Sequence, residues 1–188
     1  IMEPELTLLQ AMFTAVTLRT AGFSTINMAN CTHATRMIAT ILMFIGGAPG
    51  STSGGIRVVV FAVLILSIIA TLRNRKEVVV FYRKIDEHMI MKAITITGLS
   101  IFAVLSGIVG MTFLNNIGLE NIIFHCVSGF SDTGMEVVPT SSLNYFGKLI
   151  IMCLMFIGRV GPVVAFRIFF NTAPDQESIK YVKGELIL

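Results

Sequence analysis

An internal repeat limits the possible folds of this sequence more than any other feature. Residues 43–46 read Met-Phe-Ile-Gly, and the same four letters return 112 positions later at 155–158. The glycine-centred turn at 20–23 matches residues 132–135 at the same offset. Each copy therefore joins a polar turn to an apolar segment. Self-similarity at a fixed period indicates a structural unit that occurs twice.

The composition and the apolar run lengths predict an integral membrane protein. The chain is 54% hydrophobic and 13% charged, against about 25% charged residues in soluble domains. Residues 93–114 carry no charge, 149–166 carry only Arg159, and 37–72 carry only Arg57. A membrane-spanning helix needs about 20 apolar residues. We therefore expect an all-α membrane protein built from two helix–pore loop–helix repeats.

The longest apolar run, at 37–72, cannot be one straight helix. A helix of that length would reach about 54 Å, whereas the apolar core of a bilayer is about 30 Å thick. Residues 46–55 contain five glycines and one proline, which predicts a break in the helix. Non-helical backbone at membrane depth must be buried in protein or face a water-filled cavity.

Positive charges predict the orientation, because short basic loops face the cytoplasm. The loop at 73–84 contains Arg73, Arg75, Lys76, Arg83 and Lys84. This loop and the C-terminus would then lie inside. The two segments that turn at 20–23 and 132–135 would enter the membrane part way from the outer side, as pore loops do. The predicted repeats are 1–87 (pore helix and filter 4–24, broken inner helix 33–72, cytoplasmic loop 73–87) and 88–188 (outer helix 89–114, pore helix and filter 116–135, inner helix 145–170, cytoplasmic tail). By the offset, the first helix of the first repeat would precede residue 1, so we expect a piece of a longer protein or a shortened form.

These two re-entrant segments have the chemistry of cation-binding pore loops. A short helix that points its C-terminus at the membrane centre places about half a negative charge there. An extended turn adds carbonyl oxygens that replace the water shell of a cation. Glycine permits the backbone angles that align such carbonyls. The simpler alternative is that Gly22 and Gly134 are ordinary turn glycines, but their shared register favours a filter.

Several motifs resemble the Trk/Ktr/HKT superfamily of potassium transporters. Residues 17–24 resemble its third pore loop, and 130–135 resemble its fourth. Residues 46–57 are similar to its intramembrane gating loop, and 158–162 to its last inner helix. The Ala-Pro pair in the gating loop and the short tail are most like the C-terminal half of a Ktr-type membrane subunit. The resemblance implies two of an expected four pore repeats, and potassium uptake as the function.

The resemblance also implies the residues of the filter and the gate. The filter residues would be Thr20, Ala21, Gly22, Phe23, Asp132, Thr133, Gly134 and Met135. The gate would consist of Gly47, Ala48, Pro49, Gly50, Ser51, Thr52, Ser53, Gly54, Gly55 and Arg159. K⁺ would be the transported ion and Na⁺ a second candidate, with no covalent cofactor and no other metal.

Arg159 has two compatible interpretations. A charge at mid-membrane is costly unless it faces water or a partner. Arg159 could face the ion path and act as an electrostatic barrier to cations. Alternatively, it could anchor the gating loop by hydrogen bonds to carbonyl groups.

The resemblance implies a multi-pass protein of the cell membrane that acts as a homodimer. Its partners would be the upstream pore repeats and a cytoplasmic ring of nucleotide-binding, RCK-type regulatory subunits. The cytoplasmic loops explain the net charge of +3, so nucleic acid is not an expected partner. The sequence shows no catalytic motif, and we do not expect an enzyme. The alternative function is a non-conducting membrane assembly or binding fragment of such a transporter.

Overall fold

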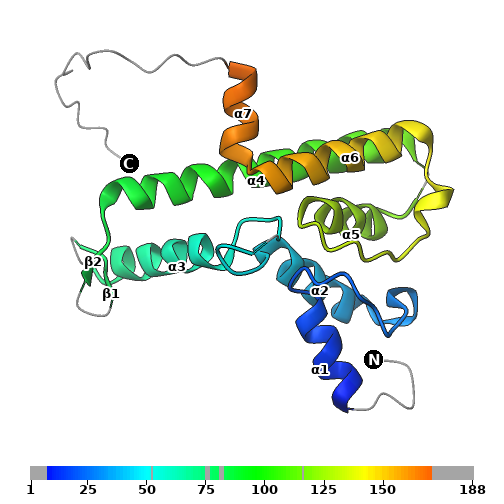
Figure 1. Cartoon of the computed structure of the whole chain (residues 1–188), viewed down its shortest axis with the longest axis horizontal. Coiled ribbons are helices and arrows are strands. Elements are labelled where there is room, and N and C mark those ends of the chain that lie inside the picture. Colours follow the sequence, from blue (N-terminus) through cyan, green and yellow to red (C-terminus); the bar gives the residue numbers. More distant parts are fainter. Residues whose placement is uncertain (1–7, 52, 75–76, 81–82, 116, 171–188) are drawn as a thin grey trace.

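A computed structural model describes residues 8–51, 53–74, 77–80, 83–115 and 117–170 (Figure 1). The regular secondary structure of the described residues is almost entirely α-helical, as the sequence predicts. Their helices are α1 (Leu8–Thr17), α2 (His33–Ile45), α3 (Val58–Leu72), α4 (Glu87–Leu114), α5 (Leu119–Phe130), α6 (Tyr145–Val160) and α7 (Pro162–Phe170), with 3-10 turns at Met28–Asn30 and Thr140–Ser142. A ribbon of two short strands, β1 (Val79–Val80) and β2 (Arg83–Lys84), joins α3 to α4. The predicted segment 4–7, Thr52 and the tail beyond 170 lie outside the described residues.

Among the described helices, α4 alone is long and apolar enough to cross a membrane. It has 28 residues and begins after Asp86, two residues before the predicted start. Helices α1, α2 and α3 are apolar but shorter. The 36-residue apolar run is divided between α2 and α3, because the glycine-rich segment interrupts it.

The backbone repeats with the same offset as the sequence. The 3-10 turn at Met28–Asn30 corresponds to the one at Thr140–Ser142, 112 residues later. Helices α2 and α6 begin at His33 and Tyr145, which have the same separation. The internal repeat is therefore a structural repeat over the turn and the start of the helix that follows.

The predicted break between α2 and α3 is present. The described residues between Ile45 and Val58 are non-helical, and Gly46, Gly50 and Gly55 have φ angles of 74°, 84° and 83°. A Cβ on Gly46 would lie 2.6 Å from the carbonyl oxygen of Gly54. The two ends of this loop therefore pack against each other, and only glycine fits at their contact.

The single inner helix predicted at 145–170 is wrong. The structure has two helices, which separate at Gly161, where φ is 93°. Pro162 begins α7, because proline has no N–H to continue the hydrogen bonds of α6 and is favourable at a first helical position. Figure 1 shows α7 turned sharply away from the axis of α6.

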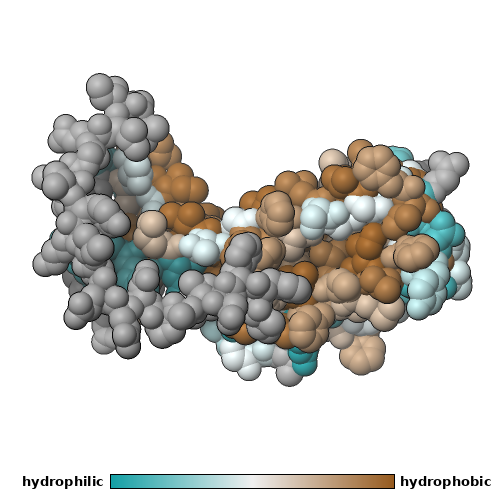
Figure 2. Space-filling model, turned by 90° about the horizontal axis from the view of Figure 1, so that it is seen from above, coloured by the Kyte–Doolittle hydropathy of each residue, from teal (hydrophilic) through white to brown (hydrophobic). Residues whose placement is uncertain are grey.

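The core lies where α2, α4, α5 and α6 meet. A Cβ on Gly107 of α4 would lie 2.6 Å from the side chain of Leu154 on α6, and one on Gly110 would lie 3.0 Å from Ile150. Small residues thus allow α4 and α6 to approach closely, as is usual between membrane helices. Elsewhere, large apolar side chains are exposed on α1, α2, α3, α4 and α6. Figure 2 shows this apolar surface over the middle of the molecule, with hydrophilic residues at the right end and again on the left.

Candidate functional site

The two predicted filter turns have the same unusual backbone. Thr20 and Asp132 are both left-handed, with φ angles of 71° and 56°. Gly22 and Gly134 are also left-handed, with φ angles of 79° and 73°. Left-handed backbone is rare for residues other than glycine. The same pair of positions adopts it in both copies, so the two turns share one conformation.

The structure brings these two turns together although they are far apart in the sequence. A Cβ on Gly22 would lie 3.1 Å from the carbonyl oxygen of Thr133. A cavity of about 420 Å³ lies between the turns. It is lined by Gly22, Ser24, Thr25, Ile26, Asn27, Met28, Gly134, Met135 and Glu136. Phe23 is exposed and does not line this cavity, whereas Met135 is buried beside it.

Hydrogen bonds from serine and threonine side chains fix the second turn. The hydroxyl of Ser128 on α5 donates to the carbonyl oxygen of Met135 at 2.8 Å. The hydroxyls of Ser131 and Thr133 lie 2.7 Å apart, and both residues are buried. Sequence reasoning did not assign a role to Ser128. Its place in the short helix before the turn is evident from the sequence, whereas its bond to a residue seven positions later is not.

The glycine-rich loop packs against the second turn. A Cβ on Gly54 would lie 2.9 Å from the carbonyl oxygen of Phe130 and 3.1 Å from Oδ2 of Asp132. The hydroxyl of Ser51 donates to the carbonyl oxygen of Ala48 at 2.7 Å and lies 2.8 Å from that of Ser53. Gly47, Gly54 and Gly55 are buried, while Ala48, Pro49 and Gly50 are exposed. The loop therefore has a packed base and a protruding tip.

Arg159 reaches the second of the two turns. Its Nη1 lies 3.9 Å from Oδ2 of Asp132, and about half of the arginine side chain is exposed. The Asp132 oxygen is buried and has no hydrogen-bond partner among the described residues. The opposite charge of Arg159 thus compensates a carboxylate oxygen that lies against Gly54. This pair was not foreseen from the sequence, because the two residues have no periodic relationship.

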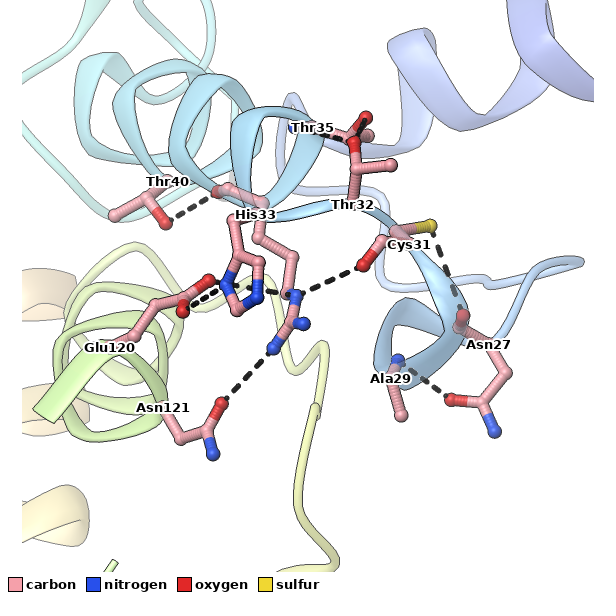
Figure 3. Close-up of polar contacts among 10 residues, drawn as sticks. Asn27, Ala29, Cys31, Thr32, His33, Thr35, Thr40, Glu120 and Asn121 are labelled. Carbon is pink, nitrogen blue, oxygen red and sulfur yellow. Dashed lines mark hydrogen bonds and ion pairs between the residues drawn. The ribbon is translucent and has the colours of Figure 1, made fainter. Parts of the chain in front are cut away.

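A second polar cluster joins the start of α2 to the start of α5 (Figure 3). Nδ1 of His33 lies 2.5 Å from Oε2 of Glu120. Arg36 donates to Oδ1 of Asn121 at 3.3 Å and to the carbonyl oxygen of Cys31 at 3.2 Å. These contacts join the first repeat to the N-terminus of α5 in the second repeat. Sequence reasoning missed this cluster, since each residue alone is an unremarkable polar group at a helix end.

Comparison with known proteins gives the family. A model of the TrkH family, described as cation transport protein, matches residues 5–121, which is more than half of the chain. The chain is 38% identical over 174 residues to Ktr system potassium uptake protein B of Bacillus subtilis, covering 93% of this chain and 39% of that protein.

Two further relatives have similar coverage. The potassium/sodium uptake protein NtpJ of Enterococcus hirae is 31% identical over 186 residues, with 96% of this chain and 41% of the relative covered. Ktr system potassium uptake protein B of Vibrio alginolyticus is 30% identical over 179 residues, with 95% and 39% covered. The chain spans about two fifths of the length of these relatives. The chain belongs to the TrkH family of cation transport proteins, which are membrane transporters and not enzymes.

Proposed function

We propose that this chain supplies two of the pore loops of a potassium uptake protein. The backbone carbonyl groups of residues 20–23 and 132–135 would coordinate the ion between them. The observation that carries this proposal is the close approach of Gly22 to the carbonyl oxygen of Thr133, between turns with matched left-handed positions. Relatives that are named for potassium uptake support K⁺ as the ion, and one relative named for potassium and sodium supports Na⁺ as a second.

The short helix α5 adds an electrostatic contribution. Every residue from Phe124 to Phe130 is buried, and the helix ends directly at the second turn. The C-terminus of a helix carries about half a negative charge. Burial reduces screening by water, so the end of α5 would favour a cation near residues 131–134. Helix α1 holds the corresponding place before the first turn.

The glycine-rich loop at 47–55 would obstruct the path beneath the filter. Its base contacts the second turn through Gly54, and its tip at 48–50 is exposed. The hydroxyl groups of Ser51 and Ser53 satisfy polar groups within the loop. The bond between Ser51 and Ser53 connects the exposed tip to the buried base, so a movement of the tip would break it.

Arg159 would act mainly as an anchor in this arrangement. At 3.9 Å from Asp132, the gross attraction is about 4 kcal/mol at an effective dielectric near 20, and water at the half-exposed guanidinium reduces the net contribution of the pair to about 1–2 kcal/mol. The carboxylate also offsets the repulsion that the guanidinium exerts on a passing cation. We therefore propose that Arg159 holds the second turn to α6, and that its barrier effect is the smaller one.

The proposed setting is the cell membrane, with the loop at 73–84 and the C-terminus in the cytoplasm. The exposed basic residues Arg73 and Lys84 support this orientation. The upstream pore repeats, a homodimer and a cytoplasmic ring of RCK-type regulatory subunits complete the proposal. Two relatives are named as parts of a Ktr system, which supports an assembly of more than one component.

The test is potassium uptake by the complete native polypeptide that carries this sequence, expressed in cells that lack their own potassium uptake. We expect uptake that selects K⁺ over Na⁺. Gly134→Ser should reduce that selectivity at least tenfold, because serine is strained at a φ of 73°. Gly98→Ser is the matched control, since Gly98 lies within α4 with open space at its Cβ position. A folded protein that supports no cation uptake would instead favour the non-conducting assembly.

A further inference from the structure

A second cavity, of about 540 Å³, lies away from the filter turns. The start of α3, the first half of α4 and the junction between α6 and α7 surround it. The break at Gly161 forms part of its wall, together with the end of α6 and the first residues of α7. A volume of 300–1,000 Å³ is typical of sites that bind small molecules.

The polar lining of this cavity is basic. Arg57 at the start of α3 and Lys92 on α4 both line it, together with the imidazole of His88. His88 and Lys92 are four residues apart on α4 and therefore lie on one face of the helix. No carboxylate is found among the described residues that line the cavity. Two permanent positive charges without a lining carboxylate favour an anionic occupant.

The neighbouring backbone adds to the positive potential. Helix α3 begins after Arg57, with no capping side chain and no acidic residue in its first turn. The first residues of α7, from Pro162 to Val164, line the same cavity. The N-terminus of each helix carries a partial positive charge. Both termini reinforce the charges of Arg57 and Lys92.

Apart from Thr95, the other side chains that line the cavity are apolar, which favours an amphiphile over a free anion as the occupant. Val60, Met91, Ile96, Val163 and Val164 line the cavity. Lys92 lies five residues after the start of α4, which is about 8 Å along the helix. Exposed apolar side chains of α4, including Met91 and Ile94, continue from this level. A charged group at this depth would have apolar surface beside it for hydrocarbon chains.

We propose that this cavity binds the headgroup of an anionic phospholipid. The phosphate would lie between Arg57 and Lys92, and the acyl chains would follow the apolar face of α4. Basic pockets between membrane helices on the cytoplasmic side are suited to such headgroups. Gly55 and Gly158 also line the cavity. The headgroup would thus contact the end of the glycine-rich loop and α6 at once, and would hold them together.

The experiment measures lipid binding directly and does not depend on transport. The complete native polypeptide would be purified, and bound phosphatidylglycerol and phosphatidylcholine with identical acyl chains would be counted by native mass spectrometry. We expect tighter binding of phosphatidylglycerol. Lys92→Gln should weaken it about fivefold. Arg57→Gly should do the same without loss of folding, because Arg57 has a φ of 76°, which glycine adopts without strain.

Arg73→Gln is the control, because it removes one positive charge at the far end of α3, next to the start of α4, and Arg73 does not line the cavity. It should leave phosphatidylglycerol binding within twofold of the wild type. Equal binding of the two lipids, or an equal loss in all three variants, would overturn the proposal. Displacement of the lipid by millimolar inorganic phosphate would also overturn it, by showing a site for free anions. If Lys92→Gln fails to fold, Lys92→Arg, which keeps the charge, should retain binding while Lys92→Met loses it.

Discussion

The α-carbon of Gly158 packs directly on the carbonyl oxygen of Phe130, so closely that a Cβ on this glycine would lie 1.8 Å from that oxygen. Phe130 is the last residue of α5, and Gly54 also approaches this carbonyl, with its Cβ position 2.9 Å from the oxygen. One backbone group at the start of the turn at 131–134 thus contacts both α6 and the glycine-rich loop. The repeated motif supplies this glycine, yet its counterpart Gly46 ends a helix instead.

Gly158→Ala should therefore be among the most damaging small substitutions in this chain. The added methyl group cannot fit, so α6 must move away from α5 at a cost of about 3 kcal/mol. Thermal unfolding of the purified native polypeptide would measure the loss. Gly98→Ala is the control, because Gly98 has open space and alanine is the better helix former. Equal melting temperatures for the two variants would contradict the close contact.

Shortening the glycine-rich loop should raise cation flux. Gly47 and Ser53 are already adjacent, since a Cβ on Gly47 would lie 2.6 Å from Oγ of Ser53. Removing residues 48–52 would therefore join two neighbouring positions and delete the tip while α2 and α3 stay in place. We expect faster potassium uptake per folded protein. Ser51→Ala, which only removes hydrogen bonds within the loop, is the milder comparison. Unchanged or abolished flux in a folded deletion variant would contradict a gate.

A double-mutant cycle should separate the two roles of Arg159. If the pair with Asp132 is an anchor, Arg159→Gln and Asp132→Asn should each lower stability by about 1–2 kcal/mol, and the double variant should lose less than their sum. If Arg159 is mainly a barrier, Arg159→Gln should raise flux by up to about a hundredfold, from roughly 3 kcal/mol of repulsion at about 5 Å. Stability and flux are measured in the same preparation. Normal values of both would refute both roles.

The loop after the second turn should show a pH-dependent contribution to stability. The hydroxyl and amide of Thr140 donate to the carboxylate of Glu136, which lowers the pKa of Glu136 below its ordinary 4.5. A lowered folded-state pKa stabilises the fold above the ordinary pKa, and the benefit is lost as the pH falls through the folded value. Thr140→Val should cost about 0.5 kcal/mol at pH 7, because the pair is exposed.

The same substitution should have a progressively smaller effect as the pH falls below 4.5, because the carboxylate becomes protonated. Ser142→Ala is the control, because that hydroxyl donates to the carbonyl oxygen of Pro139 and not to a carboxylate. Thermal unfolding at pH 7 and pH 3 provides the measurement. A loss for Thr140→Val that is the same at pH 3 and pH 7 would show that the hydrogen bond does not depend on the charge of Glu136.

The sequence predicted those features that depend on local backbone chemistry. The break after Gly46 follows from glycine density and from the length of the apolar run. The turns at Gly22 and Gly134 follow from their common register. The break at Gly161 was missed, although Gly161 and Pro162 together are a local signal, because the apolar pattern continues across them.

Contacts between residues that are far apart in the sequence could not be predicted from the hydrophobic pattern. The approach of Arg159 to Asp132 and the pair of His33 with Glu120 join different elements. Their formation depends on how α2, α5 and α6 pack, and the hydrophobic pattern gives no register between one helix and another. The sequence therefore indicated which turns matter, whereas the structure shows what holds them together.

The two copies of the repeat have the same backbone structure in the turn and at the start of the following helix, and they differ at the end of that helix. The turns and the starts of α2 and α6 match, but α2 ends at Ile45 while α6 continues to Val160, three residues past the matching position. An ion surrounded by oxygen atoms has no preferred direction, so its coordination shell benefits from near-equivalent copies. A single-file path, by contrast, needs only one obstruction to be closed. Duplication of the unit, followed by divergence of its inner half alone, would yield two equivalent turns at the ion-binding level and a single obstruction below them.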